Sequence, residues 1–301
     1  MPNRGGLIMN IQIEPGKYVL GVSGGVDSMA LLDLLSKKPD VELVVAHFNH
    51  GIRSDASKDE KLVKRAAKRY GLQFEVGHGE LGVAASEEKA RNARYAFLNA
   101  LRKRHKARAI ITAHHQDDLI ETALINILRG TGRRGLTSIM DNPGIVRPLI
   151  NTPKTKIVRY AKYHKLGWHE DSTNKDSKYL RNYIRLQIIP RLKASQKQEL
   201  VKNIEKVAKN RLELNNIIAT LSHTITSNDH VDRSKFATMP TVIANELIIF
   251  WLKANGNNQF DEKTIERLNL ALKTARPNTK VDVGKNLSLV VGATEAHFSN
   301  R

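Results

Sequence analysis

The stretch VLGVSGGVDSMALLDLL, residues 19–35, runs from an apolar segment through a glycine-rich hexapeptide, residues 23–28, into apolar residues at helical spacing. A strand, a tight turn and a helix in this order can hold an anion, because glycines let the backbone come close and the helix amides point at the charge. The loop is not a Walker A sequence, since no lysine follows its glycines at the required place. It is not a dinucleotide fingerprint, since Ser23 stands where a second glycine is needed. We therefore expect a different phosphate loop, suited to a pyrophosphate.

Asp27 is the unusual member of this loop. A carboxylate beside bound phosphates repels them unless a metal ion lies between the two. Oxygen ligands and phosphates together are typical of Mg²⁺ sites. The sequence therefore predicts Mg²⁺, with Asp27 as a ligand.

Short β-rich runs alternate with helix-like stretches after this point. The predicted strands are 18–22, 42–48, 72–76 and 108–114, and the predicted helices are 28–38, 55–70, 86–106 and 116–129. This alternation predicts an α/β fold with a parallel sheet and helices on both of its faces. Gly71 and Gly130 each follow a helical pattern, where a left-handed closing residue is expected.

The pattern changes in the last third of the chain. From about residue 196 it is helical, and beyond residue 226 a mixed segment ends in the strand-like NLSLVVGA. We predict a catalytic domain over residues 1–205. Over residues 206–301 we predict a helical connector and a smaller C-terminal domain.

The charge is strongly positive and unevenly placed. The net charge is +19, yet residues 226–301 carry 10 Lys and Arg against 8 Asp and Glu, which leaves 39 against 22 on the rest of the chain. Aromatic residues make up only 5% of the sequence. Such a balance predicts a large polyanion as partner, held mainly through its phosphates. A basic surface kept for solubility is the alternative.

The absence of cysteine excludes several kinds of protein. There can be no disulfide, no thiolate zinc site, no cysteine-bound iron–sulfur cluster and no sulfur transfer through this chain's own thiol. The first residues lack the pattern of a signal peptide, and nowhere do 18 apolar residues follow one another. We expect a cytoplasmic protein without a membrane partner.

The hexapeptide resembles the signature of the PP-loop ATP pyrophosphatases. Further segments follow in order: HFNHGIR (47–53), EEKARNARYAFL (87–98), TAHHQDDLIETALINILRGTGRRGL (112–136), RPLI (147–150) and HEDSTNKDSKYLRNYIRLQIIPRL (169–192). Together they resemble one family, the tRNA(Ile)-lysidine synthetases, over about residues 17–192. The region beyond residue 205 matches only loosely.

This resemblance implies a two-step reaction on one nucleotide. The family uses ATP and Mg²⁺ to adenylate C2 of the wobble cytidine, position 34, of tRNA(Ile) with a CAU anticodon. The ε-amine of free L-lysine then displaces AMP and gives lysidine. The chain is thus expected to be a ligase that forms a C–N bond.

The resemblance also implies where ATP binds. The loop residues are expected to hold the pyrophosphate and its metal: Ser23, Gly24, Gly25, Val26, Asp27 and Ser28. Residues at the carboxyl ends of the second and fourth predicted strands are expected to hold the adenosine, because open α/β sheets bind ligands at these edges. They are His47, His50, Arg53, Thr112 and Ala113.

The segment HHQDDLIET gathers three acids at a helix start. Asp117 and Glu121 are four residues apart and Asp118 and Glu121 three, so all three lie on one side of the helix. A helix N-terminus lowers carboxylate pKa values, so the site should stay anionic and suit a lysine ammonium. The attacking amine must lose a proton, for which Asp118 is the preferred acceptor and His114 or His115 are alternatives. An Mg²⁺ site or simple capping of the helix by acids remain open.

Two basic segments are candidates for tRNA contact. Residues 89–108 hold 8 Lys and Arg and no acid, and from this segment we expect contacts by Arg91, Arg94, Arg102, Lys103 and Arg104. A solvated helix face is the alternative. Arg181, Asn182 and Arg185 lie on a helical pattern and could clamp phosphates of the anticodon loop or of ATP. Ion pairs to Asp171 or Asp176 are the alternative for these three.

Two other functions are compatible with a PP-loop chain. One is a catalytically inactive RNA-binding protein, although Ser23, Asp27, Ser28, Asp118 and Glu121 all fit active chemistry. The other is a ligase that acts on a small molecule, against which the basic charge argues.

Overall fold

The computed structural model describes residues 9–51, 56–79, 82, 86–131, 135–140, 144–169, 180–284 and 287–300. The contacts divide the chain into two compact units, Met1–Ala208 and Lys209–Arg301. The division lies inside one long helix, a few residues from the predicted boundary after residue 205. Among the described residues, no helix has the length and hydropathy needed to cross a bilayer.

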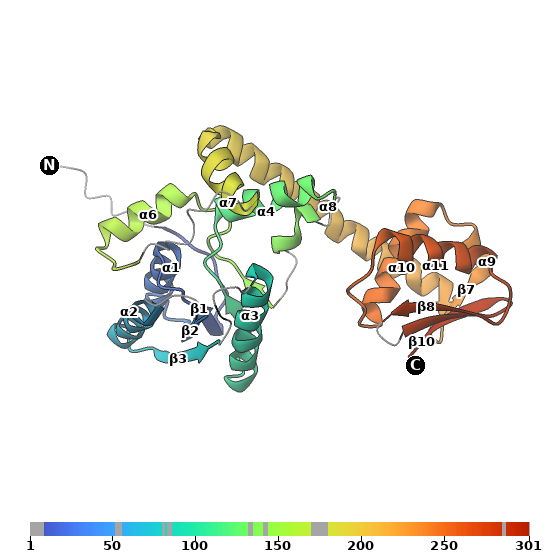
Figure 1. Cartoon of the computed structure of the whole chain (residues 1–301), viewed down its shortest axis with the longest axis horizontal. Helices are drawn as coiled ribbons and strands as arrows, with labels where there is room; N and C mark the ends of the chain where they lie inside the picture. Colours follow the sequence, from blue (N-terminus) through green and yellow to red (C-terminus); the bar gives the residue numbers. More distant parts are fainter. Residues whose placement is uncertain are drawn as a thin grey trace. The chain divides into compact units, whose positions relative to one another are not determined.

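The first unit is built on a five-stranded parallel sheet (Figure 1). The strand order is β3-β2-β1-β4-β5, and all the pairs are parallel. The bounds are β1 Gly16–Gly21, β2 Val41–Asn49, β3 Gln73–His78, β4 Ala109–Ile111 and β5 Ile145–Val146. The predicted α/β fold and parallel sheet are confirmed.

The helices of this unit cover both faces of the sheet. They are α1 Val26–Ser36, α2 Ala56–Arg69, α3 Glu87–Arg104, α4 Gln116–Leu128, α6 Lys154–Tyr163, α7 Leu180–Tyr183 and α8 Ala194–Ile225. Helices α1, α2 and α6 pack with Leu20 of β1 on one face, and α3 packs with Val19 on the other. Neighbouring residues of β1 thus serve different cores, as strand geometry requires.

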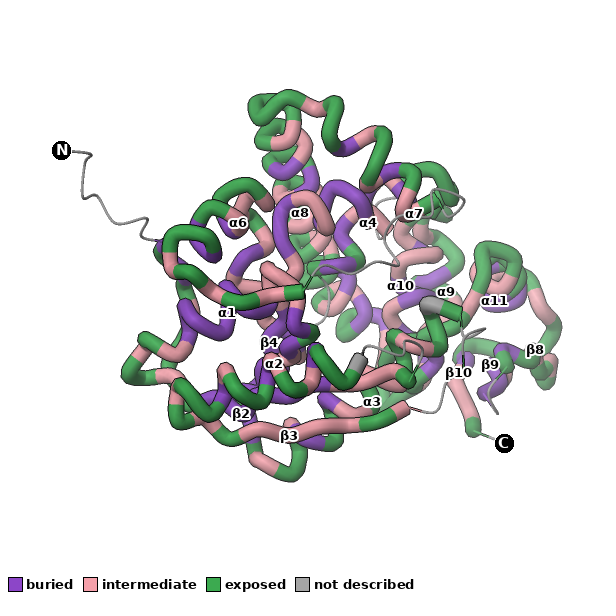
Figure 2. Tube along the Cα trace, turned by 60° about the vertical axis from the view of Figure 1, so that its left-hand side comes forward, coloured by how far each residue is buried: buried purple, intermediate pink, exposed green. Residues whose placement is uncertain are grey.

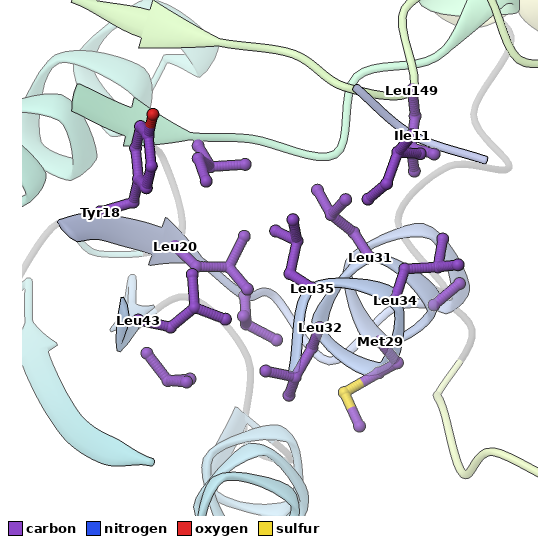
Figure 3. Close-up of a cluster of buried hydrophobic side chains, with 14 of the residues drawn as sticks. Ile11, Tyr18, Leu20, Met29, Leu31, Leu32, Leu34, Leu35, Leu43 and Leu149 are labelled. Atoms are coloured by element: carbon purple, nitrogen blue, oxygen red, sulfur yellow. The ribbon is translucent and has the colours of Figure 1, made fainter. Parts of the chain in front are cut away.

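The core between the sheet and α1 is fully apolar at its centre. Leu20, Leu31, Leu32 and Leu35 are each 0% exposed and meet in Figure 3. Figure 2 shows the resulting burial along α1, whereas α2 and α3 expose much of their outer surfaces. Since α1 is anchored along its whole length, the loop before it is fixed in place.

In the first unit, the predicted strands and helices agree with the structure apart from their ends. The predicted strand 108–114 already ends at Ile111, so Thr112 and the residues after it leave the sheet. Strand β5, only two residues long, and helix α6 had no counterpart in the predicted elements. Gly71 and Gly130 have φ values of +66° and +68°, which confirms the left-handed residues predicted after α2 and α4.

The second unit combines the end of α8 with an antiparallel sheet of order β6-β7-β10-β9-β8. Its elements are β6 Thr226–Ser227, β7 His230–Asp232, α9 Arg233–Ala237, α10 Thr241–Ala254, α11 Glu262–Thr274, β8 Thr279–Gly284, β9 Leu287–Val291 and β10 Glu295–Asn300. Phe236, Leu252, Leu272 and Leu289, all 0% exposed, centre its own core. The segment NLSLVVGA contains β9, as predicted.

Candidate active site

The glycine-rich loop joins β1 to α1 through a compact set of hydroxyl and backbone contacts. The hydroxyl of Ser28 donates to the carbonyl of Gly25 at 2.9 Å, and the oxygen of Ser23 lies 3.2 Å from that of Ser28. Gly24 has φ +91°, and a β-carbon there would lie 3.3 Å from that of Asp59. Helix α1 begins at Val26, so the N–H groups of its first turn lack partners within the helix. The loop thus presents hydroxyls and backbone donors, as an anion requires.

This loop stands where the strand order reverses. Its strand, β1, lies between β2 and β4, and open α/β sheets bind ligands in the crevice at such a point. A cavity of about 350 Å³ opens there. It is lined by nine of the predicted residues, namely Ser23, Asp27, Ser28, His47, His50, Arg94, Thr112, Ala113 and His114, together with Phe48, Asn49, Asp59 and Leu98 among others. Arg53 lies outside the described residues.

Two histidines of the cavity are held neutral. The Nδ1 atom of His47 lies 2.8 Å from the carbonyl of Val22, and burial lowers the pKa of His47. Burial lowers the pKa of His114 to about 3, and three neighbouring arginines act in the same direction, against Asp118. Its Nδ1 atom lies 2.8 Å from the hydroxyl of Thr112. Neutral imidazoles leave the cavity wall without extra positive charge at neutral pH.

Asp27 has a partner that the sequence did not predict. The ammonium of Lys154, the first residue of α6, lies 2.6 Å from each of its carboxylate oxygens. The Nε2 atom of His115 lies 3.7 Å from the same carboxylate. A lysine at a helix N-terminus opposes the helix dipole, so this ion pair with Asp27 compensates an unfavourable position. The first turns of α1 and α6 therefore meet at Asp27.

The start of α4 has the acid cluster and a complete capping box. The backbone N–H of His115 donates to Asp118 at 2.9 Å, and the N–H of Asp117 donates to Nδ1 of His115 at 3.2 Å. Since Nδ1 accepts this bond, the proton of a neutral His115 resides on Nε2. That atom lies 3.4 Å from Asp118. Asp118 therefore caps the helix, which was one of the open alternatives, and His115 stands between Asp118 and Asp27.

The carboxylates of Asp117, Asp118 and Glu121 form ion pairs with basic side chains of the same chain. Arg185 donates to Glu121 at 2.8 Å and to Asp118 at 3.3 Å, and Arg181 lies 3.2 Å from Glu121. Lys197, from the first turns of α8, donates to Asp117 at 2.9 Å. Arg185 belongs to a π-helical turn, Ile184–Ile188, a geometry that is frequent at functional sites. Arg181 and Arg185 thus face Glu121; Asp171 and Asp176 lie outside the described residues.

The environment shifts the two inner carboxylates in opposite directions. Burial alone would raise the pKa of Asp118, but His115, His114 and Arg185 lower it below its usual value. Burial raises the pKa of Glu121, which is 2% exposed, and this exceeds the opposite effect of Arg185 and Arg181. Asp118 is therefore anionic, and Glu121 accepts a proton more readily than an ordinary glutamate.

The basic residues of α3 do not form one uniform surface. The guanidinium carbons of Arg91 and Arg94 lie 5.1 and 5.5 Å from the ring centre of Tyr95. Arg104 forms an ion pair with Glu75 at 2.5 Å, so part of its charge serves the fold. Lys103 is exposed and Arg102 half-buried. Asn182 is half-buried on α7 beside Arg181.

Several residues of this region had no sequence signal strong enough to find them. Lys154 and Lys197 are ordinary lysines in basic segments, and only the fold brings them to Asp27 and Asp117. Asp59 of α2, 8% exposed, contacts His169 at 2.7 Å beneath the loop. These are contacts between segments far apart in the sequence, to which no local pattern points.

Comparison with known proteins places this geometry in a family. A family model described as a PP-loop domain matches residues 7–192. A tRNA(Ile)-lysidine synthase of Francisella tularensis subsp. novicida is 30% identical over 284 residues, which cover 90% of this chain and 71% of that protein. The chain belongs to the tRNA(Ile)-lysidine synthase family. It is thus an ATP-dependent ligase.

Other relatives agree. The tRNA(Ile)-lysidine synthase of Caldanaerobacter subterraneus subsp. tengcongensis is 40% identical over 210 residues, covering 66% of this chain and 45% of that protein. Among solved structures, a U34-tRNA thiolase from Methanococcus maripaludis matches with a TM-score of 0.54 and 19% identity, over 69% of this chain and 75% of the other. That likeness concerns the fold alone. A lysidine synthase with the PP-loop domain binds ATP, and the loop and cavity described above are the candidate site.

Proposed function

We propose that this chain converts the wobble cytidine of tRNA(Ile) with a CAU anticodon into lysidine. ATP first adenylates the oxygen at C2 of the cytidine, with loss of pyrophosphate. The ε-amine of free L-lysine then attacks C2, and AMP leaves. The observation that carries this proposal is the adjacency, through His115, of a phosphate loop and a cluster of anionic side chains that bind cations.

The loop is proposed to hold the phosphates of ATP. The hydroxyl of Ser23, the N–H groups at Gly24 and Val26, and the dipole of α1 supply donors for the pyrophosphate. The hydroxyl of Ser28 and the N–H of Gly25 now donate within the loop and would have to turn to the phosphates. The walls at His47, His50, Thr112 and Ala113 are proposed to hold the adenosine, with Arg53 in the same role.

Mg²⁺ fits this loop through Asp27. The ion commonly takes one or two carboxylates together with substrate phosphates and water, so a single aspartate at the phosphate loop suffices. When bound, Mg²⁺ neutralises phosphate charge and acts as a Lewis acid. Lys154 now neutralises Asp27 at 2.6 Å and would have to share or release this carboxylate.

Asp117, Asp118 and Glu121 are proposed to bind free lysine. Each carboxylate can accept about four hydrogen bonds, so an incoming ammonium can join the arginines as well as displace one. Lys197 on Asp117 is a lysine ammonium already bound at this cluster. Its presence supports the choice of ligand.

The proton of the attacking amine needs an acceptor. Asp118, preferred on sequence grounds, has a lowered pKa, and His114 has a pKa of about 3, so both are weak bases. His115 already accepts a bond at Nδ1. The raised pKa of Glu121 makes this residue the stronger candidate. We therefore assign the proton to Glu121 and the orientation of the ammonium to Asp118.

Recognition of the tRNA is proposed to use both basic segments. Arg91, Arg94, Arg102, Lys103 and Arg104 would contact phosphates along α3, and Arg181, Asn182 and Arg185 would lie where RNA and lysine meet. The unit from Lys209 to Arg301 is proposed to help select the tRNA.

The test is transfer of lysine. The chain is incubated with ATP, Mg²⁺, radiolabelled L-lysine and bulk tRNA, and the nucleic acid is recovered and digested. We expect label in a single modified cytidine, dependent on ATP. RNA binding without label would favour the inactive RNA-binding alternative, and label on a small molecule only would favour the other ligase.

A further inference from the structure

The guanidinium of Arg147 contains a buried nitrogen and has no role in the proposed reaction. Arg147 directly follows β5, at the edge of the sheet where the ATP cavity opens. One terminal nitrogen donates to the carbonyl of Ile145 at 3.2 Å. Its Nε atom is shielded from solvent and has no hydrogen-bond partner in the part of the chain that the structure describes. An unsatisfied buried donor costs stability and points to a missing acceptor.

The surroundings of Arg147 are cationic. Burial lowers the pKa of Arg147, the Arg91 guanidinium lowers it further, and Tyr95 acts in the opposite direction. Within the described ranges, neither Arg91 nor Arg147 forms an ion pair with a carboxylate. Arg91 and Arg94 lie over the ring of Tyr95. The phenol oxygen of Tyr95 is also buried, and Arg147 is its hydrogen-bonding neighbour among the described residues.

We propose that Arg147, Arg91 and the hydroxyl of Tyr95 form a phosphate site beside the ATP cavity. Guanidinium groups match phosphate oxygens with paired hydrogen bonds, and a phenol adds a third donor. A bound anion would satisfy the buried donors and relieve the repulsion between the two arginines. No carboxylate among the described residues neutralises Arg147 or Arg91.

The phosphate can come from two sources. One is a phosphodiester of the RNA strand next to the target nucleotide, and the other is the α-phosphate of ATP, since Arg94 and His114 line the cavity on this side. The first source rests on the proposed function, because it requires tRNA as a substrate. Separate binding measurements distinguish the two.

The experiment uses the full chain and measures two affinities for each variant, for ATP by calorimetry and for labelled tRNA by fluorescence anisotropy at several salt concentrations. The variants are Arg147→Met, Arg91→Met and the double variant. Arg159→Met is the matched control, because Arg159 is exposed on α6. Arg147→Lys keeps the charge but loses the paired geometry.

We expect Arg147→Met to weaken one affinity about 10-fold or more, and Arg147→Lys to recover part of the loss. Weaker tRNA binding indicates that the bound group is the RNA phosphodiester, if the slope of log affinity against log salt concentration also falls by about one. Weaker ATP binding with unchanged tRNA binding indicates the α-phosphate. The double variant should lose less than the product of the two single losses, since both arginines hold the same group.

The proposal is overturned if both single variants bind ATP and tRNA as Arg159→Met does. If Arg147→Met fails to fold, Tyr95→Phe decides by the same two affinities, because it removes only the phenol hydroxyl of the site, whereas Arg91 is already a proposed tRNA contact on α3. A parent chain that binds tRNA but incorporates no lysine contradicts the proposed function, whereas the affinities still decide the phosphate site.

Discussion

Asp118 and Glu121, one helical turn apart on α4, have pKa values displaced in opposite directions. Asp118 accepts a backbone hydrogen bond and lies near two histidines, so its charged form is favoured. Glu121 is buried more deeply, and for it desolvation outweighs the two arginines. Carboxylates whose environments separate their pKa values in this way serve different roles in a reaction.

The first prediction separates these roles. Glu121→Gln keeps the shape of the side chain, removes its charge and its capacity as a base, and should leave formation of adenylated tRNA intact. Loss of one charge-assisted hydrogen bond of about 1.5–3 kcal/mol corresponds to a rise in the KM for lysine of roughly 10- to 100-fold. The second step should also slow at saturating lysine, because only weaker bases remain to accept the proton.

Asp118→Asn is the companion variant. We expect a higher KM for lysine, but the rate of the second step at saturating lysine should fall less than in Glu121→Gln. Single-turnover quenching that follows adenylated tRNA and lysidine separately measures both. If either variant makes no adenylate, the cluster belongs to the Mg²⁺ and ATP side, and the lysine assignment fails.

The second prediction concerns Asp27. Asp27→Asn should abolish adenylation while tRNA affinity stays unchanged, because the variant removes a candidate metal ligand and frees Lys154 without adding repulsion. Asp40→Asn, an exposed aspartate after α1, is the control. Release of AMP and pyrophosphate at the parental rate by the Asp27 variant would remove this residue from the chemistry.

At the scale of elements, the buried carboxylate of Asp33 joins α1 to α6 and to Tyr70, the residue that follows α2. Asp33, 5% exposed, accepts hydrogen bonds from Tyr160 at 2.6 Å, Tyr70 at 2.8 Å and Lys37 at 2.6 Å. Burial alone would raise its pKa, yet these three donors lower it. Since α1 carries Asp27 and α6 carries Lys154, the same contact aligns the two helices that meet at the phosphate loop.

The third prediction follows from this contact. Asp33→Asn should reduce the free energy of unfolding by about 1–3 kcal/mol at neutral pH, because charge-assisted hydrogen bonds are lost in a buried place. An acid with a lowered folded pKa stabilises above its unfolded pKa of about 3.9 and loses this contribution as the pH falls through the folded value. The difference between parent and variant should therefore vanish in acid.

Denaturant unfolding as a function of pH measures this difference. Tyr163→Phe, on an exposed residue of the same helix α6, serves as the control and should unfold like the parent. A difference that persists unchanged below the folded pKa would mean that shape, and not charge, explains the loss.

Local patterns were sufficient to predict most elements of the first unit. Short β-rich runs predicted β1 to β4, and the glycine loop predicted the turn into α1. Strand β5 has two residues, too few for a periodic pattern, and its pairing with β4 depends on the rest of the sheet. The π-helical turn at Arg185 was predicted only as a helix, because the extra residue in that turn has no local signature.

At the scale of the whole molecule, the distribution of charge could be predicted from the sequence, but the long-range contacts could not. The excess of basic residues before position 226 is visible in the composition. The pairing of individual basic and acidic residues is not visible there. Arg185 and Glu121 are 64 residues apart, and Lys154 and Asp27 are 127 residues apart. Residue types and local spacing located the candidate site, and the fold supplied its internal ion pairs.

The fourth prediction is a steep salt dependence of tRNA binding. Each neutralised phosphate releases counterions, so the logarithm of the affinity should fall linearly with the logarithm of salt concentration. Lys103→Gln on α3 should lower this slope by about one if Lys103 contacts a phosphate. Lys280→Gln on β8, from the nearly neutral end of the chain, should change it less; the reverse order would contradict the expected division of charge.

The central claim is that two chemical steps share this site, adenylation at the phosphate loop and lysine transfer at the acid cluster. The most direct measurement omits lysine at first: the chain, Mg²⁺ and tRNA(Ile) are mixed with ATP labelled in its α-phosphate, and the RNA is then separated. We predict label attached to the RNA, and its release as AMP when unlabelled lysine is added. Label that never becomes attached to the RNA, while lysine enters it in a parallel reaction, would contradict the account.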